Sequence, residues 1–203
     1  MKRFLTVVLL IMATLTMNAQ GKNEPEKKKF ISSLGLGGSF VVGDNTQGVS
    51  SSFAYKLGVL YEWQAYKDIY VIPGIEAISR SHKVSGYDNS FSRFYLQIPV
   101  CAAYKFDLTK HVKPLSYFET FDIVGKIGPY FAFGLFGTQI EELSGAVNDI
   151  FDSHNRFDAG ILLGLGVDIG EVVVGFEFSR GFTKITELDM YNLAFGVTLA
   201  YKF

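Results

Sequence analysis

The last twelve residues of the chain, Asn192 to Phe203, read NLAFGVTLAYKF. Large apolar side chains stand at every second position of this stretch, and small or polar side chains stand between them. Because successive side chains of a β-strand point to opposite faces, the pattern predicts one strand with a fully apolar face. The stretch ends on the aromatic Phe203, which indicates that the strand ends in an apolar environment.

Seven further segments show the same alternation, and turn-rich stretches separate them. Together with the last stretch, the predicted strands are residues 30–43, 53–65, 69–81, 92–106, 123–138, 156–169, 171–182 and 192–203. Short links, namely Tyr66-Lys67-Asp68 and the tight turn at Gly170, alternate with longer polar loops. This arrangement predicts an all-β fold, a closed antiparallel eight-stranded transmembrane β-barrel.

Alternation alone also fits a lipocalin-like barrel, in which the apolar face points inward. Three observations favour the membrane orientation. The polar face is rich in glycine, which makes room in a narrow lumen. The apolar faces of segments 53–65, 92–106 and 192–203 carry no charge and many aromatic residues. Strands of about ten tilted residues cover an apolar band of about 25 Å, and these segments are long enough.

Charged residues on the polar face are expected to point into the lumen: Lys56, Glu62, Glu76, Arg80, Lys105, Lys126, Arg156, Asp158, Asp168, Glu177 and Lys202. Six are positive and five are negative, and buried charges must pair because desolvation is costly. We expect Lys126 to pair with Glu76 or Glu177 at middle height, where Asp158 also points inward. Lys56 and Arg80 are expected nearer the long loops.

Two features disagree with a regular barrel. Pro73, Pro99 and Pro129 fall within predicted strands, and a proline removes a hydrogen bond between strands, so we expect bulges there. The link from Asp107 to Asp122 is long where the alternation requires a short turn. Its apolar residues are expected to pack under the barrel mouth; they are Leu115, Phe118 and Phe121.

The beginning of the chain predicts export. Residues 1–19 have a charged start and an apolar run too short to span a bilayer, which is typical of a cleaved signal peptide. Residues 20–29 are predicted to form a polar, flexible tail, and residues 30–203 are predicted to form the barrel domain.

No pattern predicts catalytic chemistry, so the chain is not expected to be an enzyme or to carry a catalytic, cofactor-binding or metal site. His82, His111 and His154 are scattered in predicted connections without metal-ligand spacing. The run Asp152-Ser153-His154 contains hydrolase residue types, but neighbours on one loop rarely form a triad. A net charge of −1 gives no electrostatic case for nucleic acid, and the single cysteine, Cys101, is expected to be a buried core residue.

Gly164-x-Gly166 lacks the rest of a phosphate-binding fingerprint and falls within a predicted strand. It therefore predicts no nucleotide site.

Several stretches resemble the small outer-membrane β-barrel family that includes PorT-like proteins. They are residues 95–100 followed by 104–106, residues 128–130, residues 156–160 and the aromatic-ended last strand. The resemblance implies an eight-stranded barrel in the outer membrane of gram-negative bacteria, with periplasmic termini. Separately, the terminal Phe203 after the last strand resembles the C-terminal signal by which the barrel insertion machinery recognises outer-membrane β-barrel proteins. The departure from the family is the long link 107–122.

The function we expect is a structural or partner-binding role, with outer-membrane lipid around the barrel and a protein partner at the surface loops. One alternative is a component of a protein secretion machine, as the resemblance to PorT-like proteins suggests. Another is a small porin or transporter. An eight-stranded lumen filled by side chains makes an open pore the weaker of these.

Overall fold

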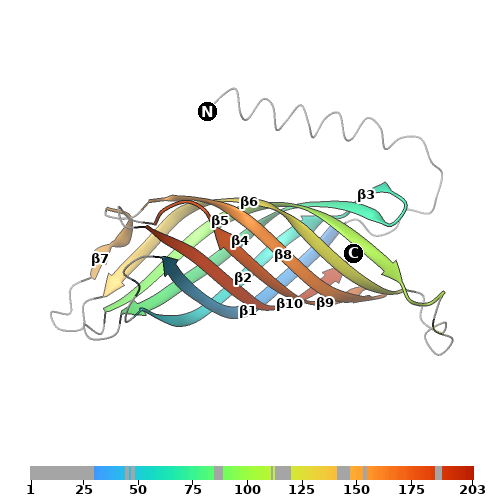
Figure 1. The fold of residues 1–203 in the computed structure, drawn as a ribbon, viewed down its shortest axis with the longest axis horizontal. Helices are drawn as coiled ribbons and strands as arrows, with labels where there is room; N and C mark the ends of the chain where they lie inside the picture. Colours follow the sequence, from blue (N-terminus) through green and yellow to red (C-terminus); the bar gives the residue numbers. More distant parts are fainter. Residues whose placement is uncertain are drawn as a thin grey trace, which may run out of the picture.

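In the computed structural model, the chain forms a closed barrel of long, tilted, antiparallel strands (Figure 1). The structure describes residues 30–43, 46, 49–84, 89–110, 112, 120–140, 147–152, 155–185 and 189–203. The predicted signal peptide and tail, residues 1–29, lie outside this described part. Within it, the prediction of an all-β, closed, eight-stranded barrel is confirmed.

Eight long strands form the described barrel wall: β1 (Phe30–Gly43), β2 (Val49–Tyr61), β4 (Ile69–Val84), β5 (Asn89–Asp107), β6 (Phe121–Ile140), β8 (Phe157–Ile169), β9 (Val172–Gly181) and β10 (Met190–Lys202). Two short strands extend this wall: β3 (Trp63–Tyr66) continues β2 after a break at Glu62, and β7 (Val147–Asp149) pairs with the end of β6. The 3-10 helix η3 (Ile150–Asp152) follows β7.

The last strand closes the barrel. β10 pairs with β1 along its whole length, from Ile31 opposite Lys202 to Gly43 opposite Met190. Every other long strand pairs with its neighbours in the sequence, and β2 pairs with β4. The described long strands therefore leave no open sheet edge, which removes a common route to aggregation.

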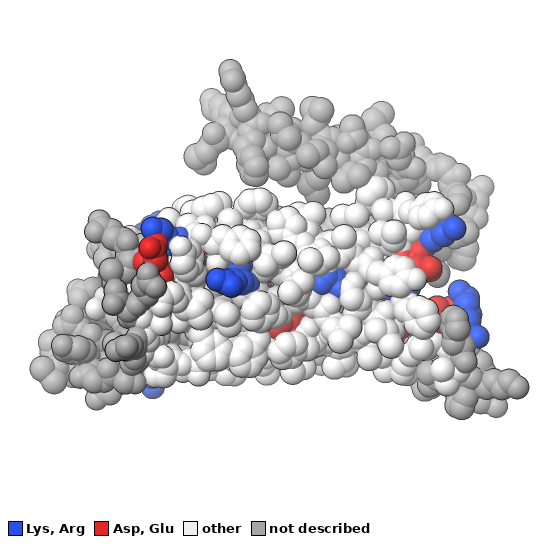
Figure 2. Space-filling view, in the orientation of Figure 1, with Lys and Arg blue, Asp and Glu red and all other residues white. Residues whose placement is uncertain are grey.

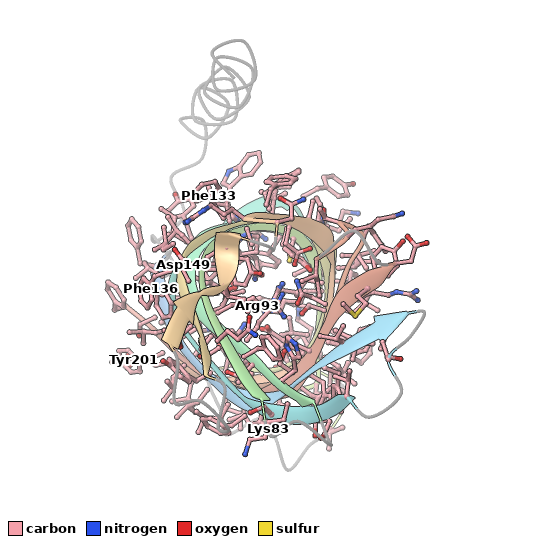
Figure 3. The ribbon with its side chains drawn as sticks, turned by 90° about the vertical axis from the view of Figure 1, so that its left-hand side faces the viewer. Lys83, Arg93, Phe133, Phe136, Asp149 and Tyr201 are labelled. Carbon is pink, nitrogen blue, oxygen red and sulfur yellow. The ribbon has the colours of Figure 1, made fainter. Side chains whose placement is uncertain are left out.

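The apolar face of the barrel is its outer face. Val59 is 51% exposed and Leu57 is 62% exposed, whereas Glu76 in the lumen is 1% exposed. In Figure 2 the barrel wall is a broad uncharged surface with few charged atoms between its two ends. Phe133, Phe136 and Tyr201 point outward in the view along the barrel (Figure 3). The predicted membrane-type orientation is confirmed, and the lipocalin-like alternative is wrong for this chain.

The prediction of bulges at the prolines is wrong. Pairing between β4 and β5 pauses after Pro73 and resumes at Glu76 in the same register. Pairing between β5 and β6 likewise pauses after Pro99 and resumes unshifted at Ala102, and Pro129 keeps its partner Ile161. The missing N–H groups are thus accommodated by short gaps in the pairing, not by extra residues.

A register shift does occur between β5 and β6, away from the prolines. Phe94 lies opposite Phe136, but Tyr95 lies opposite Gly134, so Leu135 is an extra residue in β6. Leu135 and Phe136 are consequently both exposed on the outer face. Strict alternation along β6 would have turned Phe136 into the lumen, and the bulge prevents this.

Two tight turns lie at the end of the barrel that carries β3 and the C-terminus, which we call the short-turn rim (Figure 1). Lys67 and Gly170 adopt positive φ angles of 45° and 62° in these turns. Phe121 of the long link begins β6 and pairs with Ile169, so it belongs to the wall and not to a plug beneath it. Leu115 and Phe118 lie outside the described residues. Among the described residues, no helix is long and apolar enough to cross a membrane.

Candidate functional site: the side chains that fill the lumen

A middle cluster of charges crosses the lumen. Lys56 Nζ donates to Glu76 Oε1 at 3.0 Å and also to Glu177. Lys126 Nζ donates to the other oxygen of Glu177 at 2.5 Å. Glu177 therefore bridges two lysines from opposite parts of the wall. The predicted pairing of Lys126 with Glu177 is confirmed, whereas Lys56 lies in this middle cluster and not nearer the long loops.

A second cluster lies toward the short-turn rim. Asp168, which is fully buried, accepts hydrogen bonds from Lys105 at 2.9 Å and from Lys202 at 2.6 Å. Lys105 also pairs with Glu62 at 2.6 Å, and its ammonium lies 4.6 Å from the centre of the Tyr70 ring. The break between β2 and β3 falls at Glu62, whose carboxylate reaches this cluster.

A third cluster lies toward the opposite end, which carries the longer links and which we call the loop end. Asp158 Oδ2 accepts hydrogen bonds from Arg80, from the Tyr130 hydroxyl at 3.0 Å and from Asn192 at 3.2 Å. The Arg80 guanidinium lies 5.1 Å from the centre of the Tyr130 ring. Arg80 and Asp158 both point inward as predicted, and Arg80 lies toward the long loops as expected. Asp158 was expected at middle height, but it lies in this loop-end cluster.

Gln97 connects the loop-end cluster to the middle cluster. Its side-chain oxygen accepts from Arg80 at 3.1 Å, and its side-chain nitrogen donates to Glu76 at 2.9 Å. Paired charges and amides thus form a connected network over much of the lumen. Because removing one member leaves a buried partner unsatisfied, such a network fixes the arrangement of the strands.

Sequence reasoning missed two lumen residues at the loop end. His82 was placed in a connection, but it lies in β4, is 6% exposed and stacks on Phe91 with 4.7 Å between ring centroids. Arg93 was not assigned, yet it is fully buried and points into the lumen (Figure 3). The period-two spacing from Arg80 to His82 and from Tyr95 back to Arg93 was the signal that could have found both.

A short segment that we call the cap, Val147–Asp152, folds inward at the loop end. Ile150 is fully buried and Phe151 is 7% exposed, and the Phe151 ring packs edge-on against Tyr95 at 5.9 Å. A Cβ atom on Gly134 would lie 2.2 Å from the Phe151 ring. Only glycine at this position leaves room for the cap to enter the barrel.

Arg156 supports the cap from outside, so its predicted place in the lumen is wrong. Its guanidinium lies 4.8 Å from the centre of the Phe151 ring and pairs with Asp149 at 3.5 Å. Its side chain is 41% exposed. Residue 156 precedes the first residue of β8, so strand alternation does not set its direction.

The lumen retains small cavities. One, of about 70 Å³, is lined by Arg80, Gln97, Lys56 and Glu177 among others. Another, of about 60 Å³, is lined by Lys126, Glu177, Lys105 and Asp168 among others. The two lie on either side of Glu177, and each has room for a few water molecules. Glu177 and Thr198 line both cavities.

Two exposed ion pairs lie at links between strands and do not belong to the network in the lumen. A hydrogen bond to Asp189 raises the pKa of Lys184 in the link between β9 and β10. A hydrogen bond to Asp107 raises the pKa of Lys110 at the short-turn rim. Both lysine side chains are exposed to solvent, so screening leaves these pairs little influence on stability.

The structure gives no support for chemistry at the other candidate residues. Among the described residues, no group of three or more His, Cys, Asp or Glu side chains could hold a metal ion. His111, Ser153 and His154 lie outside the described part of the chain. Cys101 is 2% exposed inside the barrel, as predicted. Gly164 and Gly166 lie in the middle of β8, which is not a phosphate-binding turn.

The fold resembles that of solved bacterial surface barrels. Neisserial surface protein A matches with a TM-score of 0.51 at 13% identity, over 86% of this chain and 97% of that chain. Ail, the attachment invasion locus protein of Yersinia pestis, matches with a TM-score of 0.47 at 14% identity, over 87% and 100% of the two chains. OprG, an outer membrane protein of Pseudomonas aeruginosa, matches with a TM-score of 0.44 at 12% identity, over 88% and 98%.

No protein-family model matches the sequence, and the search among curated proteins gives no match either. The match to neisserial surface protein A shows the architecture of a small outer-membrane β-barrel, and at this identity it shows the fold alone.

Proposed function

We propose that the chain is an outer-membrane β-barrel protein of a gram-negative cell envelope, with a side-chain-filled lumen and a partner-binding role at its loop end. The single observation that carries this proposal is the inversion of its two surfaces. Large apolar side chains cover the outside, while the ion pairs lie inside. In water this arrangement would expose a large apolar area, and in a bilayer it places that area against lipid.

The filled lumen argues against transport as the main role. Three clusters of paired charges and the cap occupy the bore at successive heights. The described residues include no group that could hold a metal ion, and the proposal includes no enzymatic activity. The loop end is then the part of the barrel that remains for contact with another molecule, since loops on a rigid scaffold commonly carry binding function.

The orientation that we propose for the barrel in the membrane is supported by the position of the first and last residues of the barrel, which meet at one rim. Phe30 and Phe203 exchange backbone hydrogen bonds of 3.4 and 2.9 Å at the short-turn rim. In this proposal residues 1–19 act as a signal peptide, the short-turn rim faces the periplasm and the loop end faces outward. The last strand is the segment that the insertion machinery recognises.

Membrane location is tested by heat-modifiable migration. The full chain, refolded in detergent, should run faster on gels before boiling than after, because a closed barrel resists unfolding by detergent alone. In cells, the protein should fractionate with the outer membrane. If a sample that circular dichroism shows to be β-rich migrates equally far before and after boiling, the proposed membrane barrel is contradicted.

Partner binding is tested by crosslinking in intact envelopes. A photo-crosslinker at position 184 in the loop-end link should capture a specific protein. The matched control carries the crosslinker at Lys67 in the short turn of the opposite rim. A secretion-machine component captured from the loop end would favour the PorT-like role. Equal capture from both positions, or none, would remove the support for loop-end binding.

A further inference from the structure

Among the side chains that the structure describes, the outer face of the eight long strands carries two charges, and both are basic. They belong to Lys83 of β4 and Arg180 of β9, which are both exposed. Lys83 follows the lumen residue His82, and it points away from the barrel in Figure 3. Each of the two lies one residue before the loop end of its strand. The outer wall is therefore positively charged at one end only.

Neither of these basic side chains has a carboxylate partner in the described part of the chain. They differ in this from Arg156 and Lys184, the exposed basic residues of the loop-end links, which each pair with an aspartate. A charge on a wall that faces lipid is costly unless an opposite charge balances it. Lys83 and Arg180 therefore need counter-charges from outside the described protein.

Lys83 lies at the height of the lipid headgroups. The outer face of β4 starts after the short turn with Ile69 and includes Ile75, which is 58% exposed. A strand rises about 3.4 Å per residue and is tilted by about 40° in such barrels, so Ser81 lies about 31 Å beyond Ile69 along the barrel axis. The apolar band is about 25 Å tall, so Ser81 and Lys83 lie past its edge, in the layer of the headgroups.

Two hydroxyl groups accompany Lys83 on the outer face. Ser81 and Ser92 lie directly opposite each other in the pairing of β4 with β5. The Ser81 hydroxyl donates to the Ser92 hydroxyl at 3.3 Å, and this hydrogen bond is exposed. Ser81 is two residues from Lys83 and so shares its face of the strand. An ammonium group beside hydroxyl donors suits the oxygens of a phosphate, which accept strong charge-assisted hydrogen bonds.

Arg180 marks a second place, on the opposite side of the barrel. Three long strands separate β9 from β4 in either direction around the wall. Arg180 lies opposite Ile161 of β8 and Leu193 of β10, and Phe178 precedes it on the same face. Because these neighbours are apolar, the guanidinium lies at the border of the apolar band. A long arginine side chain at such a border extends toward the headgroups, where a phosphate accepts two parallel hydrogen bonds from it.

We propose that the outer wall at the loop end binds the phosphate groups of anionic lipids at two sites. One site is Lys83 with the Ser81 and Ser92 hydroxyls, and the other is Arg180. The proposal rests on the proposed membrane location and names the lipid chemistry that this end of the barrel selects. The phosphates supply the negative charges that the two basic side chains lack. The loop end therefore prefers a leaflet that is rich in headgroups with an accessible phosphate.

Native mass spectrometry of the refolded full chain tests the two sites. The probe is phosphatidic acid, which ends in a bare phosphate, and the reference is phosphatidylcholine, whose choline group neutralises the phosphate. The wild type should retain two more molecules of phosphatidic acid than of phosphatidylcholine. Lys83→Gln and Arg180→Gln should each retain one fewer, and the double variant should show no preference. The control Lys67→Gln removes an exposed positive charge at the opposite rim and should keep the wild-type preference.

A second measurement uses the wild type alone. A phosphatidic acid analogue with a photoreactive group beside its phosphate, in phosphatidylcholine vesicles, should label the peptides that contain Lys83 and Arg180. Equal labelling of both rims would overturn the proposal, as would a wild type without lipid preference or a Lys67→Gln variant that loses it. Heat-modifiable migration first shows that each sample is a folded barrel, so these results would overturn the lipid sites alone. A chain that never folds in lipid would overturn the proposed function and the lipid sites together.

Discussion

At the residue scale, Glu177 is the branch point of the lumen network. It accepts from Lys56 with one oxygen and from Lys126 with the other, while Lys56 also pairs with Glu76. The middle cluster is thus a line of alternating charges with Lys126 at one end and Glu76 at the other. Removing an inner member of such a line leaves two like charges without a common partner, whereas removing an end member does not.

Glu177→Gln is therefore expected to be costly. The change leaves Lys56 and Lys126 facing a single carboxylate, Glu76, in a poorly hydrated lumen. Breaking a buried ion pair by removing one partner typically costs about 3–5 kcal/mol. Lys126→Ala should cost less, because Glu177 keeps its pair with Lys56 and the Lys126 side chain is 20% exposed. Equilibrium unfolding in urea, with the protein in lipid vesicles, measures both.

The double variant Glu177→Leu with Lys126→Leu is the control for charge balance. It removes one charge of each sign and leaves the Lys56–Glu76 pair intact. It should be considerably more stable than Glu177→Gln. Equal destabilisation by the double and single variants would mean that packing around Glu177 and not its charge determines the loss.

The sequence predicted most of these pairs because inward positions follow from strand alternation, and a narrow lumen forces opposite charges together. It did not predict which partners meet, since that depends on the stagger between strands. Arg156 was placed inside because the alternation was extended one residue beyond β8. Arg93 was overlooked near the end of a predicted segment, although its spacing from Tyr95 is the same as that of the other inward residues.

At the element scale, the turn between β8 and β9 depends on one backbone conformation. Gly170 has a φ of +62°, and no atom lies within 4 Å of the position where its Cβ would be. A side chain there meets no steric neighbour, so only the left-handed backbone conformation opposes it. Gly170→Val should destabilise the barrel by about 1–2 kcal/mol, the cost of that conformation for an ordinary residue.

Two controls isolate the backbone effect in urea unfolding. Gly170→Asn should be milder, because asparagine visits the left-handed region more readily. Gly125→Ala adds a Cβ at another open position where the φ is not positive, and it should be close to neutral. If Gly170→Asn is as destabilising as Gly170→Val, the turn conformation is not the cause.

A charge placed on the outer face of β2 tests whether lipid surrounds this strand. Val59 is 51% exposed in the middle of an uncharged row. Val59→Lys should lose roughly 2–4 kcal/mol in lipid vesicles, the range for lysine at the bilayer midplane. Ser51→Lys, at an exposed position near the loop end of the same strand, should lose less than about 1 kcal/mol, because the cost falls toward the interface. Equal, small losses would mean that no bilayer surrounds Val59.

Element boundaries were predictable where alternation is strict, and β1 matches its predicted range of 30–43. The prediction of bulges at the prolines was wrong because a proline removes one hydrogen bond between strands but does not require an extra residue. One bulge that does occur, at Leu135, is marked by no proline, and a run of apolar residues around it hides the change of face. The cap was missed because it follows a long link, where strand periodicity gives no information.

At the scale of the whole molecule, the lumen is blocked at several heights. The Lys105–Asp168 pair lies toward one end, the Glu177 bridge lies in the middle, and the Arg80–Asp158 pair lies beneath the cap. The cavities of about 70 and 60 Å³ are both lined by members of the middle cluster. An ion would have to break an ion pair at each level to pass. We therefore expect the lumen to be closed by paired charges in series and not by a single gate.

Planar-bilayer recording provides the last prediction. The wild type should show no stable single-channel conductance, even when gel migration proves that the barrel is folded. Because the blocks are in series, removing one should not open the pore. A variant with Lys56, Glu76, Lys126 and Glu177 all changed to Ser loses the middle cluster without a net change of charge, and it should still be closed. A large porin reconstituted in the same bilayer serves as the positive control. A persistent open channel in the wild type would make the protein a small porin. Conductance only in the serine variant would show that the middle cluster alone closes the lumen.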